Sequence, residues 1–334
     1  MLLATLGGLA AAIWAFGSTG FGSVIAVAGR IGFAGFLIYC LYSIGVFAIL
    51  GGAWLAVAPG EPLDRLGRFT WARMVREAVS DLLPFSQIGG IVVGIRTLTL
   101  HRMLASRVYA SFVVDLTTEM AAQLVFTLFG LAMMVSMLVQ GGNAVALRPL
   151  ILGGTAVMVA VMVMFFTAQR PALGLAGRIA QQFLPGSVMA MTGITDEMRR
   201  IYGQPRRTAL GFALNLAGWT ATAIGSWIVL LMMGVHISIW SALSIESLIF
   251  TLRSVAFAIP GAIGVQEAAY ALAGPLFGLP AETALALSLA KRARDVGLGL
   301  PTLLAWQFGE ARAVVRDVRK VSGGRQSLPE IPAE

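Results

Sequence analysis

Long apolar runs separated by short polar segments extend along most of the chain. Runs of about 20 apolar residues can cross a bilayer as a helix, and because these runs are continuous rather than alternating they disfavour a transmembrane β-barrel. Two further apolar stretches, 70–100 and 247–279, are interrupted in the middle by proline and glycine. We therefore expect an all-α polytopic membrane protein with about six transmembrane helices. The predicted spans are 1–17, 33–57, 108–140, 148–168, 207–234 and 281–308.

Each interrupted stretch predicts two half-helices joined by a bend. Pro84 lies in the middle of the first stretch and is followed by Gly89 and Gly90, and Pro260 and Gly261 interrupt the second. Proline removes a helical hydrogen bond and glycine loosens the backbone. Such breaks are tolerated at membrane depth where the backbone packs on protein or lines a cavity.

The distribution of arginine and lysine predicts the orientation, because short cytoplasmic loops of membrane proteins carry an excess of both. The stretch 141–147 and the region around His236 contain neither residue and are predicted to lie outside. Each interrupted stretch then has both ends on one side of the membrane, so we expect two opposed re-entrant hairpins that meet near the midplane. The segments assigned to the cytoplasm are 58–76, 101–107, 169–206 and the tail at 311–334.

An internal repeat fits the same topology. Shifting the sequence by 176 residues places Pro84 on Pro260 without a gap. With three spans each, the two halves would be inverted relative to one another, an architecture in which transporters bind substrate at the repeat interface. The alternative is coincidence, since apolar runs align easily. The predicted halves are 1–140 and 141–310, followed by a basic cytoplasmic tail at 311–334; the shift also places 33–57 on 209–233, 105–125 on 281–301, Asp115 on Lys291 and Glu119 on Asp295.

The composition narrows the class of protein. Of the 334 residues, 57% are hydrophobic and only 12% are charged, whereas soluble proteins carry roughly a quarter charged residues, so a large water-facing enzyme domain is excluded. The 24 basic and 16 acidic residues fit basic loops against anionic lipid in a bacterial inner membrane, and no nucleic-acid partner is expected. The single cysteine, Cys40, cannot form an intramolecular disulfide, and a cleaved signal peptide is not expected.

Ionisable residues inside the predicted membrane segments mark the candidate site, because each costs at least about 2.5–3.5 kcal/mol at the bilayer centre. In the first hairpin, Arg73, Arg76, Glu77 and Asp81 recur at three- and four-residue spacing, so they share one face of a helix. This face either lines a cavity or belongs to an amphipathic helix that lies at the membrane surface with its charges reaching water.

Two predicted spans carry further charge clusters. Asp115 and Glu119 lie one helical turn apart and repel each other unless a cation or a proton is near. Four interpretations remain open for these two carboxylates: a proton-relay pair, a cation site, the partners of arginines in the first hairpin, or part of a static ion pair. The last span holds four charges within 291–295, among which Lys291 and Asp295 are spaced to pair with each other.

The second hairpin places Arg253 seven residues before its proline, about 10 Å along a helix. Its planar guanidinium suits a phosphate, and the alternative is an ion pair with Glu246 or Glu267.

Together these clusters predict a polar cavity between the two halves. The predicted substrate-binding residues are Arg76, Glu77, Asp81, Gln87, Asp115, Glu119, Arg253, Gln266, Glu267, Lys291, Arg294 and Asp295.

Motifs of catalysis and metal binding are missing from the sequence. There is no aspartate-rich motif of the kind that holds magnesium diphosphate, and no Walker loop. His101 and His236 are far apart and lack metal-ligand spacing, and no serine or cysteine nucleophile lies beside a histidine. We therefore expect no catalytic residue, no metal, no cofactor and no enzymatic activity.

Two signatures carry a resemblance to a known family. One runs from Arg76 through Pro84 to Gly90, and the other runs from Leu252-Arg253 through Pro260-Gly261 to Gln266-Glu267. They resemble the flippase-type membrane domain of lysylphosphatidylglycerol synthases, over about 60–310 of this chain. The resemblance is closest to the free-standing, hopanoid-biosynthesis-associated branch, in which the stretch 288–295 is also similar.

The resemblance implies lipid translocation. In the synthases this domain moves a lipid across the bilayer, and a separate soluble domain makes that lipid; the present chain has no such second domain, so aminoacylation is not expected. We expect a flippase that moves a hopanoid between leaflets of the bacterial inner membrane. The alternatives are a flippase of polyprenyl phosphates or phospholipids, and a membrane enzyme or accessory subunit of hopanoid side-chain modification. The expected partners are a hopanoid or anionic lipid substrate, a second copy of the chain, and proteins of hopanoid biosynthesis or export.

Overall fold

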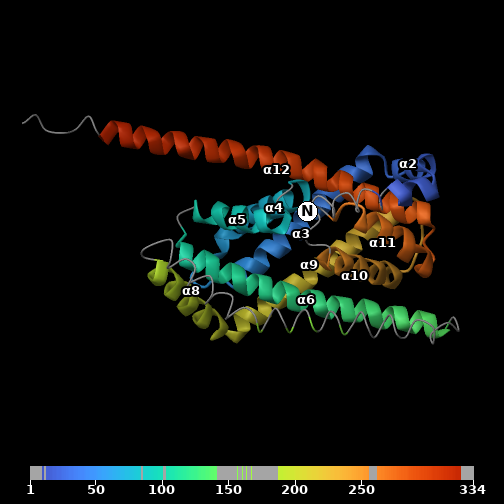
Figure 1. Cartoon of the computed structure of the whole chain (residues 1–334), viewed down its shortest axis with the longest axis horizontal. Coiled ribbons are helices and arrows are strands. Elements are labelled where there is room, and N and C mark those ends of the chain that lie inside the picture. Colours follow the sequence, from blue (N-terminus) through green and yellow to red (C-terminus); the bar gives the residue numbers. More distant parts are fainter. Residues whose placement is uncertain are drawn as a thin grey trace, which may run out of the picture.

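The computed structural model describes residues 13–83, 86–100, 103–140, 187–255 and 262–324, together with 10, 156, 160, 163 and 167. Throughout these residues the regular elements are helices, as predicted (Figure 1). Three helices of the described part are long and apolar enough to cross a membrane: α3 (Gly32–Ala56), α6 (Ala105–Gln140) and α9 (Pro205–Met232). They confirm the polytopic membrane class and coincide with the spans predicted at 33–57, 108–140 and 207–234.

The remaining predicted spans have different outcomes. The span at 148–168 and most of the span at 1–17 lie outside the described residues. The span predicted at 281–308 is the first part of α12 (Ala281–Gly324), a single helix of 44 residues that contains Pro301. At 1.5 Å per residue α12 is about 66 Å long, and its carboxyl-terminal part projects beyond the other helices (Figure 1).

The first interrupted stretch forms two helices, α4 (Leu66–Leu82) and α5 (Ser86–Thr99), which pack against each other. A glycine allows this close approach: a Cβ atom at Gly90 would lie 2.6 Å from the backbone oxygen of Arg76. Pro84, the predicted cause of the break, lies outside the described residues. The division into two half-helices is therefore confirmed, and the return of the chain to the same membrane face stays a prediction.

The second interrupted stretch contains α10 (Ile239–Val255) and α11 (Val265–Ala273), followed by the short helix η3 (Gly274–Phe277). The helix α10 begins at Ile239 rather than at 247, because the Ser238 hydroxyl accepts a hydrogen bond of 3.0 Å from the backbone N–H of Ser241 and so caps the helix. The bend at Pro260 lies outside the described residues.

The contacts between helices follow the register of the predicted repeat. The helix α3 packs on α9, α4 packs on α12, and α6 packs on α10; a shift of 176 residues exchanges these pairs. The starts of α6 at Ala105 and of α12 at Ala281 differ by that shift, and so do the ends of α3 at Ala56 and of α9 at Met232. The opposite orientation of the two halves in the membrane stays a prediction.

Cysteine labelling in intact vesicles tests that orientation. In a Cys40→Ser background, Leu63→Cys and Leu104→Cys, which flank the first hairpin at exposed positions, should both react only from the cytoplasmic side. Arg199→Cys on α8 (Ser187–Tyr202) should do the same, and His236→Cys should react only from outside. Labelling of positions 63 and 104 from opposite sides would contradict the re-entrant hairpin and the inverted repeat together.

Candidate functional site

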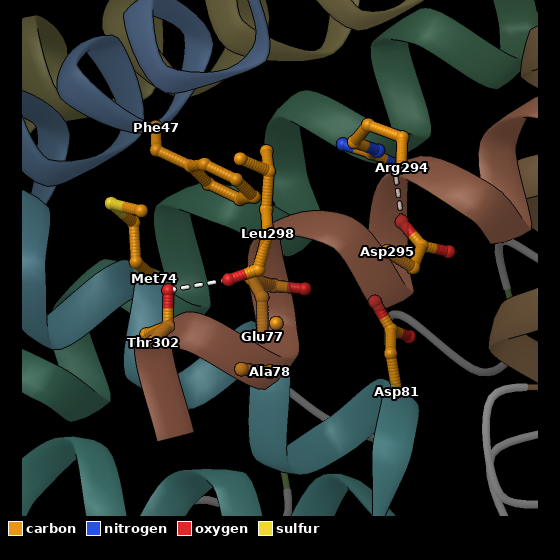
Figure 2. Close-up of a pocket in the computed structure, with 10 residues that line it drawn as sticks. Phe47, Met74, Glu77, Ala78, Asp81, Arg294, Asp295, Leu298 and Thr302 are labelled. Atoms are coloured by element: carbon orange, nitrogen blue, oxygen red, sulfur yellow. Dashed lines mark hydrogen bonds and ion pairs between the residues drawn. The ribbon is translucent and has the colours of Figure 1, made fainter. Parts of the chain in front are cut away.

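A small cavity of about 20 Å³, enough for about one water molecule, lies where α4 packs on α12 and α3 (Figure 2). One wall is apolar and the other carries carboxylates. The close approach of α12 to α4 at this point depends on Gly299, since a Cβ atom there would lie 2.6 Å from a methyl carbon of Leu82. The lining residues are Phe47 of α3, then Met74, Glu77, Ala78 and Asp81 of α4, and Arg294, Asp295, Leu298, Gly299 and Thr302 of α12.

The charges that line this cavity are mainly negative. Glu77, Asp81 and Asp295 contribute three carboxylates, against the single guanidinium of Arg294. Arg294 pairs with Asp295 at 2.7 Å, while the second oxygen of Asp295, Oδ2, has no hydrogen-bond partner. Arg253 of α10 reaches the rim and donates to Asp81 at 3.0 Å. Both arginines therefore pair with carboxylates, and two buried atoms of the lining, Asp295 Oδ2 and Arg294 Nε, have no hydrogen-bond partner.

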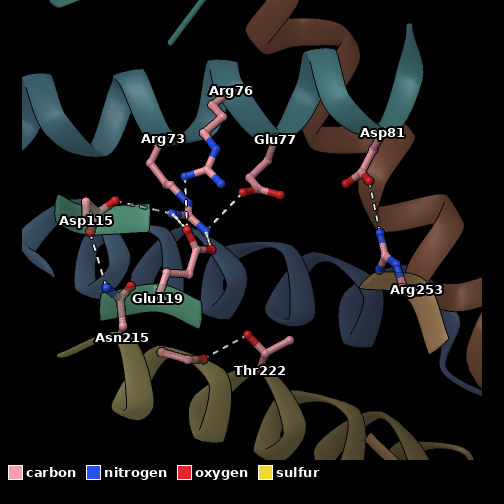
Figure 3. A network of polar contacts seen from close by, with 10 residues as sticks. Arg73, Arg76, Glu77, Asp81, Asp115, Glu119, Asn215, Thr222 and Arg253 are labelled. Carbon is pink, nitrogen blue, oxygen red and sulfur yellow. Dashed lines mark hydrogen bonds and ion pairs between the residues drawn. The ribbon is translucent and has the colours of Figure 1, made fainter. Parts of the chain in front are cut away.

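A cluster of buried arginines lies about one turn closer to the amino-terminal end of α4 than the cavity (Figure 3). Arg73, only 2% exposed, donates to both carboxylate oxygens of Glu119 and lies 3.1 Å from Glu77. Arg76 donates to the same Glu119 at 3.1 Å. Charge-assisted, bidentate pairing of this kind is what a buried guanidinium requires. The alternative of a surface helix with its charges in water is therefore wrong for Arg73 and Arg76, because α6 supplies carboxylates that hold them inside.

Asp115 has a partner that the sequence analysis missed. Asn215 of α9 is completely buried and donates from Nδ2 to Asp115 Oδ1 at 3.2 Å. An asparagine within an otherwise apolar span is unusual, and that signal could have identified it by the rule applied to the charged residues. The expectation that Asp115 and Glu119 face the arginines of the first hairpin agrees with these contacts.

Three pairings that the sequence analysis offered as alternatives are wrong. Arg253 pairs with Asp81 rather than with Glu246 or Glu267. Glu267 accepts a hydrogen bond of 2.6 Å from the backbone N–H of Gly264 at the start of α11 and pairs with Arg292 at 3.0 Å. The carboxylate of Glu267 is turned away from Arg253 because it satisfies an otherwise unpaired N–H at the end of its own helix.

The third wrong pairing concerns Lys291 and Asp295. Lys291, 1% exposed, donates to Glu246 at 2.5 Å and to the Tyr270 hydroxyl at 2.9 Å, while Asp295 pairs with Arg294. The Lys291 ammonium also lies 5.2 Å from the centre of the Phe250 ring, within cation–π range. Its partners come from α10 and α11, together with Ser226 of α9 at 3.5 Å, so Lys291 belongs to a paired cluster between helices and not to the cavity.

The predicted binding residues thus separate into distinct places. Four of them line the cavity: Glu77, Asp81, Arg294 and Asp295. Arg253 contacts the cavity through Asp81, and Arg76, Asp115 and Glu119 form the arginine cluster behind it. Gln266 donates to Ser288 at 2.9 Å and, like Glu267 and Lys291, lies among α10, α11 and α12. The side chain of Gln87 lies outside the described residues.

Comparison with known proteins agrees with the resemblance seen in the sequence. Neither a curated protein nor a solved structure matches the chain. The model of the family described as "Lysylphosphatidylglycerol synthase TM region" matches residues 1–302, which include both interrupted stretches and every cavity-lining residue. The chain therefore belongs to the lysylphosphatidylglycerol synthase TM region family, and it is a membrane protein of lipid metabolism or transport.

Proposed function

We propose that the protein is a flippase of the bacterial inner membrane and that the small cavity between α4 and α12 widens to receive the lipid headgroup. The observation that carries this proposal is the lining of the cavity. Carboxylates of Glu77, Asp81 and Asp295 face the apolar side chains of Phe47, Met74 and Leu298 within a bundle of membrane helices. Such charges are costly at membrane depth and are kept there for a function. A lipid carries the same two chemistries, a polar headgroup and an apolar remainder.

The charge of the lining favours a particular headgroup. Three carboxylates against one arginine disfavour a phosphate, and Arg253, the residue best suited to bind one, is already paired with Asp81. Hydroxyl or ammonium groups would instead donate hydrogen bonds to Asp295 Oδ2, which lacks a partner. We therefore favour a hopanoid with a hydroxylated or amino side chain over a polyprenyl phosphate or an anionic phospholipid.

The ion pair between Asp81 and Arg253 gives the cavity a means of responding to its ligand. Asp81 lies near the end of the first limb of one hairpin and Arg253 near the end of the first limb of the other, and the pair joins them across 172 positions of sequence (Figure 3). A headgroup that donates to Asp81 competes with Arg253. Its binding would weaken the link between α4 and α10, the helices that the predicted repeat relates, and so favour opening toward one leaflet.

Proteoliposomes test the function and its substrate class together. We expect wild-type protein to move a fluorescent hydroxylated hopanoid faster than fluorescent phosphatidylglycerol. Asp295→Asn should slow that movement by roughly tenfold, because a hydrogen bond to a charged group contributes about 1.5–3 kcal/mol. Glu310→Gln is the matched control, since Glu310 pairs with Arg96 outside the cavity.

Two results would contradict the proposal. Faster movement of phosphatidylglycerol, with no effect of Asp295→Asn, would favour the flippase of anionic lipids. A change in the mass of the hopanoid, measured by mass spectrometry after incubation with the protein, would favour a membrane enzyme, because transport changes the leaflet of a lipid and leaves its mass unchanged.

A further inference from the structure

Two buried oxygen atoms at the contact of α6 with α9 have no hydrogen-bond donor. Asp115 and Asn215 are both completely buried, yet Asp115 Oδ2 and Asn215 Oδ1 are each without a partner. The two side chains belong to one contact, since Asn215 Nδ2 donates to the other oxygen of Asp115 at 3.2 Å (Figure 3). Buried acceptors without a donor are rare in folded proteins, and each calls for a specific explanation.

The orientation of the Asn215 amide is fixed by its neighbours. The Thr118 hydroxyl donates to the backbone oxygen of Asp115 at 2.9 Å, so its oxygen can only accept from Asn215 Nδ2, which lies at 3.1 Å. Both amide hydrogens of Asn215 are then used, one for Asp115 and one for Thr118. The amide oxygen of Asn215 therefore remains a buried acceptor, and Asp115 Oδ2, which is directed at Arg73 (Figure 3), is a second one.

No guanidinium of the cluster lies within hydrogen-bond distance of Asp115 Oδ2. The charged groups that face Asp115 in the described part of the chain are Arg73, Arg76 and Glu77 of α4 and Glu119 of α6, while α9 contributes the neutral Asn215. Arg73 Nη1 lies 3.8 Å from Asp115 Oδ2, beyond hydrogen-bond length, because the same guanidinium binds Glu119 and Glu77. If Asp115 is ionised, the cluster contains three carboxylates but only the two guanidiniums of Arg73 and Arg76. One negative charge is then uncompensated next to the completely buried Asp115.

A metal ion is a poor candidate for the missing charge. No group of three or more histidine, cysteine, aspartate or glutamate side chains within the described residues is placed to hold one. A proton on the Asp115 carboxyl, by contrast, removes the uncompensated negative charge of the cluster.

We infer that Asp115 is a proton-binding site of this protein and that Arg73 couples it to the cavity. In the protonated state the Asp115 carboxyl is neutral, and Arg73 is shared by Glu119 and Glu77. When the proton leaves to water, the ionised carboxylate attracts Arg73, which lies 3.8 Å away, and draws it from Glu77, 3.1 Å on its other side. Because Glu77 lines the cavity, gain or loss of one proton at Asp115 changes the charge that a headgroup meets. The coupling to transport rests on the proposed function, whereas the binding of a proton does not.

Infrared difference spectroscopy of the full-length protein in lipid vesicles tests the proton site without any transport. Wild-type protein should show a carboxylic-acid C=O stretching band, and Asp115→Asn should lose it while the protein stays folded, because asparagine has the shape and the neutral charge of the protonated acid. Asp196→Asn, which removes a carboxylate exposed on α8, is the control and should keep the band. A band that survives Asp115→Asn would overturn the assignment. The alternative result is a wild type that lacks the band and gains thermal stability when sodium is added at constant pH and ionic strength. That result would assign the site at Asp115 to a cation.

The coupling is tested separately, in proteoliposomes with a pH difference across the membrane. Wild-type transport of the hydroxylated hopanoid should respond to that difference, and the response should be lost in Asp115→Asn. If the variant loses the infrared band yet transports with an unchanged response, Asp115 binds a proton and the coupling through Arg73 is wrong. If wild-type protein moves no lipid and the band is still present, the proposed function fails and the proton site remains.

Discussion

Replacing Glu119 by alanine should leave little folded protein after extraction from the membrane. Glu119 is the shared acceptor of Arg73 and Arg76, and both guanidiniums are buried. Removing one partner of a buried ion pair costs about 3–5 kcal/mol in soluble proteins, because the remaining charge stays buried without compensation. That loss is a large fraction of the roughly 5–15 kcal/mol by which proteins are stable. Thermal unfolding followed by tryptophan fluorescence, with size-exclusion profiles, measures the effect.

The matched control for this experiment is Glu310→Ala. Glu310 also forms a two-point pair with an arginine, but Arg96 is 57% exposed, and exposed pairs contribute about 0–1 kcal/mol. The conservative variant Glu119→Gln keeps an acceptor oxygen and should lie between the wild type and Glu119→Ala. Equal losses of stability in Glu119→Ala and Glu310→Ala would mean that the arginines of α4 reach water and that the buried cluster is wrongly assigned.

Replacing Lys291 by methionine should destabilise the protein by a similar amount, and a second substitution should restore it. Lys291→Met leaves the buried Glu246 carboxylate with the Tyr270 hydroxyl as its remaining donor. Adding Glu246→Gln removes the uncompensated charge and still offers Tyr270 an acceptor. Since replacing a whole buried pair by uncharged groups is often neutral or stabilising, the double variant should recover most of the stability lost in Lys291→Met.

The same double variant distinguishes a structural pair from a transport site. The pair of Lys291 and Glu246 lies outside the cavity lining. The folded double variant should therefore move lipid at close to the wild-type rate in proteoliposomes. A double variant that folds but does not transport would show that the pair takes part in the lipid path, and the site would have to extend to α10 and α11.

The sequence by itself determined the helical class, the spans of α3, α6 and α9, the division of 70–100 into two half-helices and the family. These properties depend on local features: the length of apolar runs, the spacing of polar residues along one helix, and proline or glycine at particular positions. The shared face of Arg73, Arg76 and Glu77 was also predictable, because helical periodicity alone places them together.

The tertiary structure alone decided which charges meet. Glu246 lies 45 positions from Lys291, and Asp81 lies 172 positions from Arg253. Whether such residues touch depends on how whole helices rotate and cross in the folded protein. The sequence of one helix does not determine that arrangement. Sequence reasoning therefore favoured partners one turn apart, such as Lys291 with Asp295, and it overlooked the neutral Asn215. The acidic balance of the cavity and the unpaired oxygen atoms at Asp115 arise from these long-range contacts, because burial and partner choice are set only when helices pack.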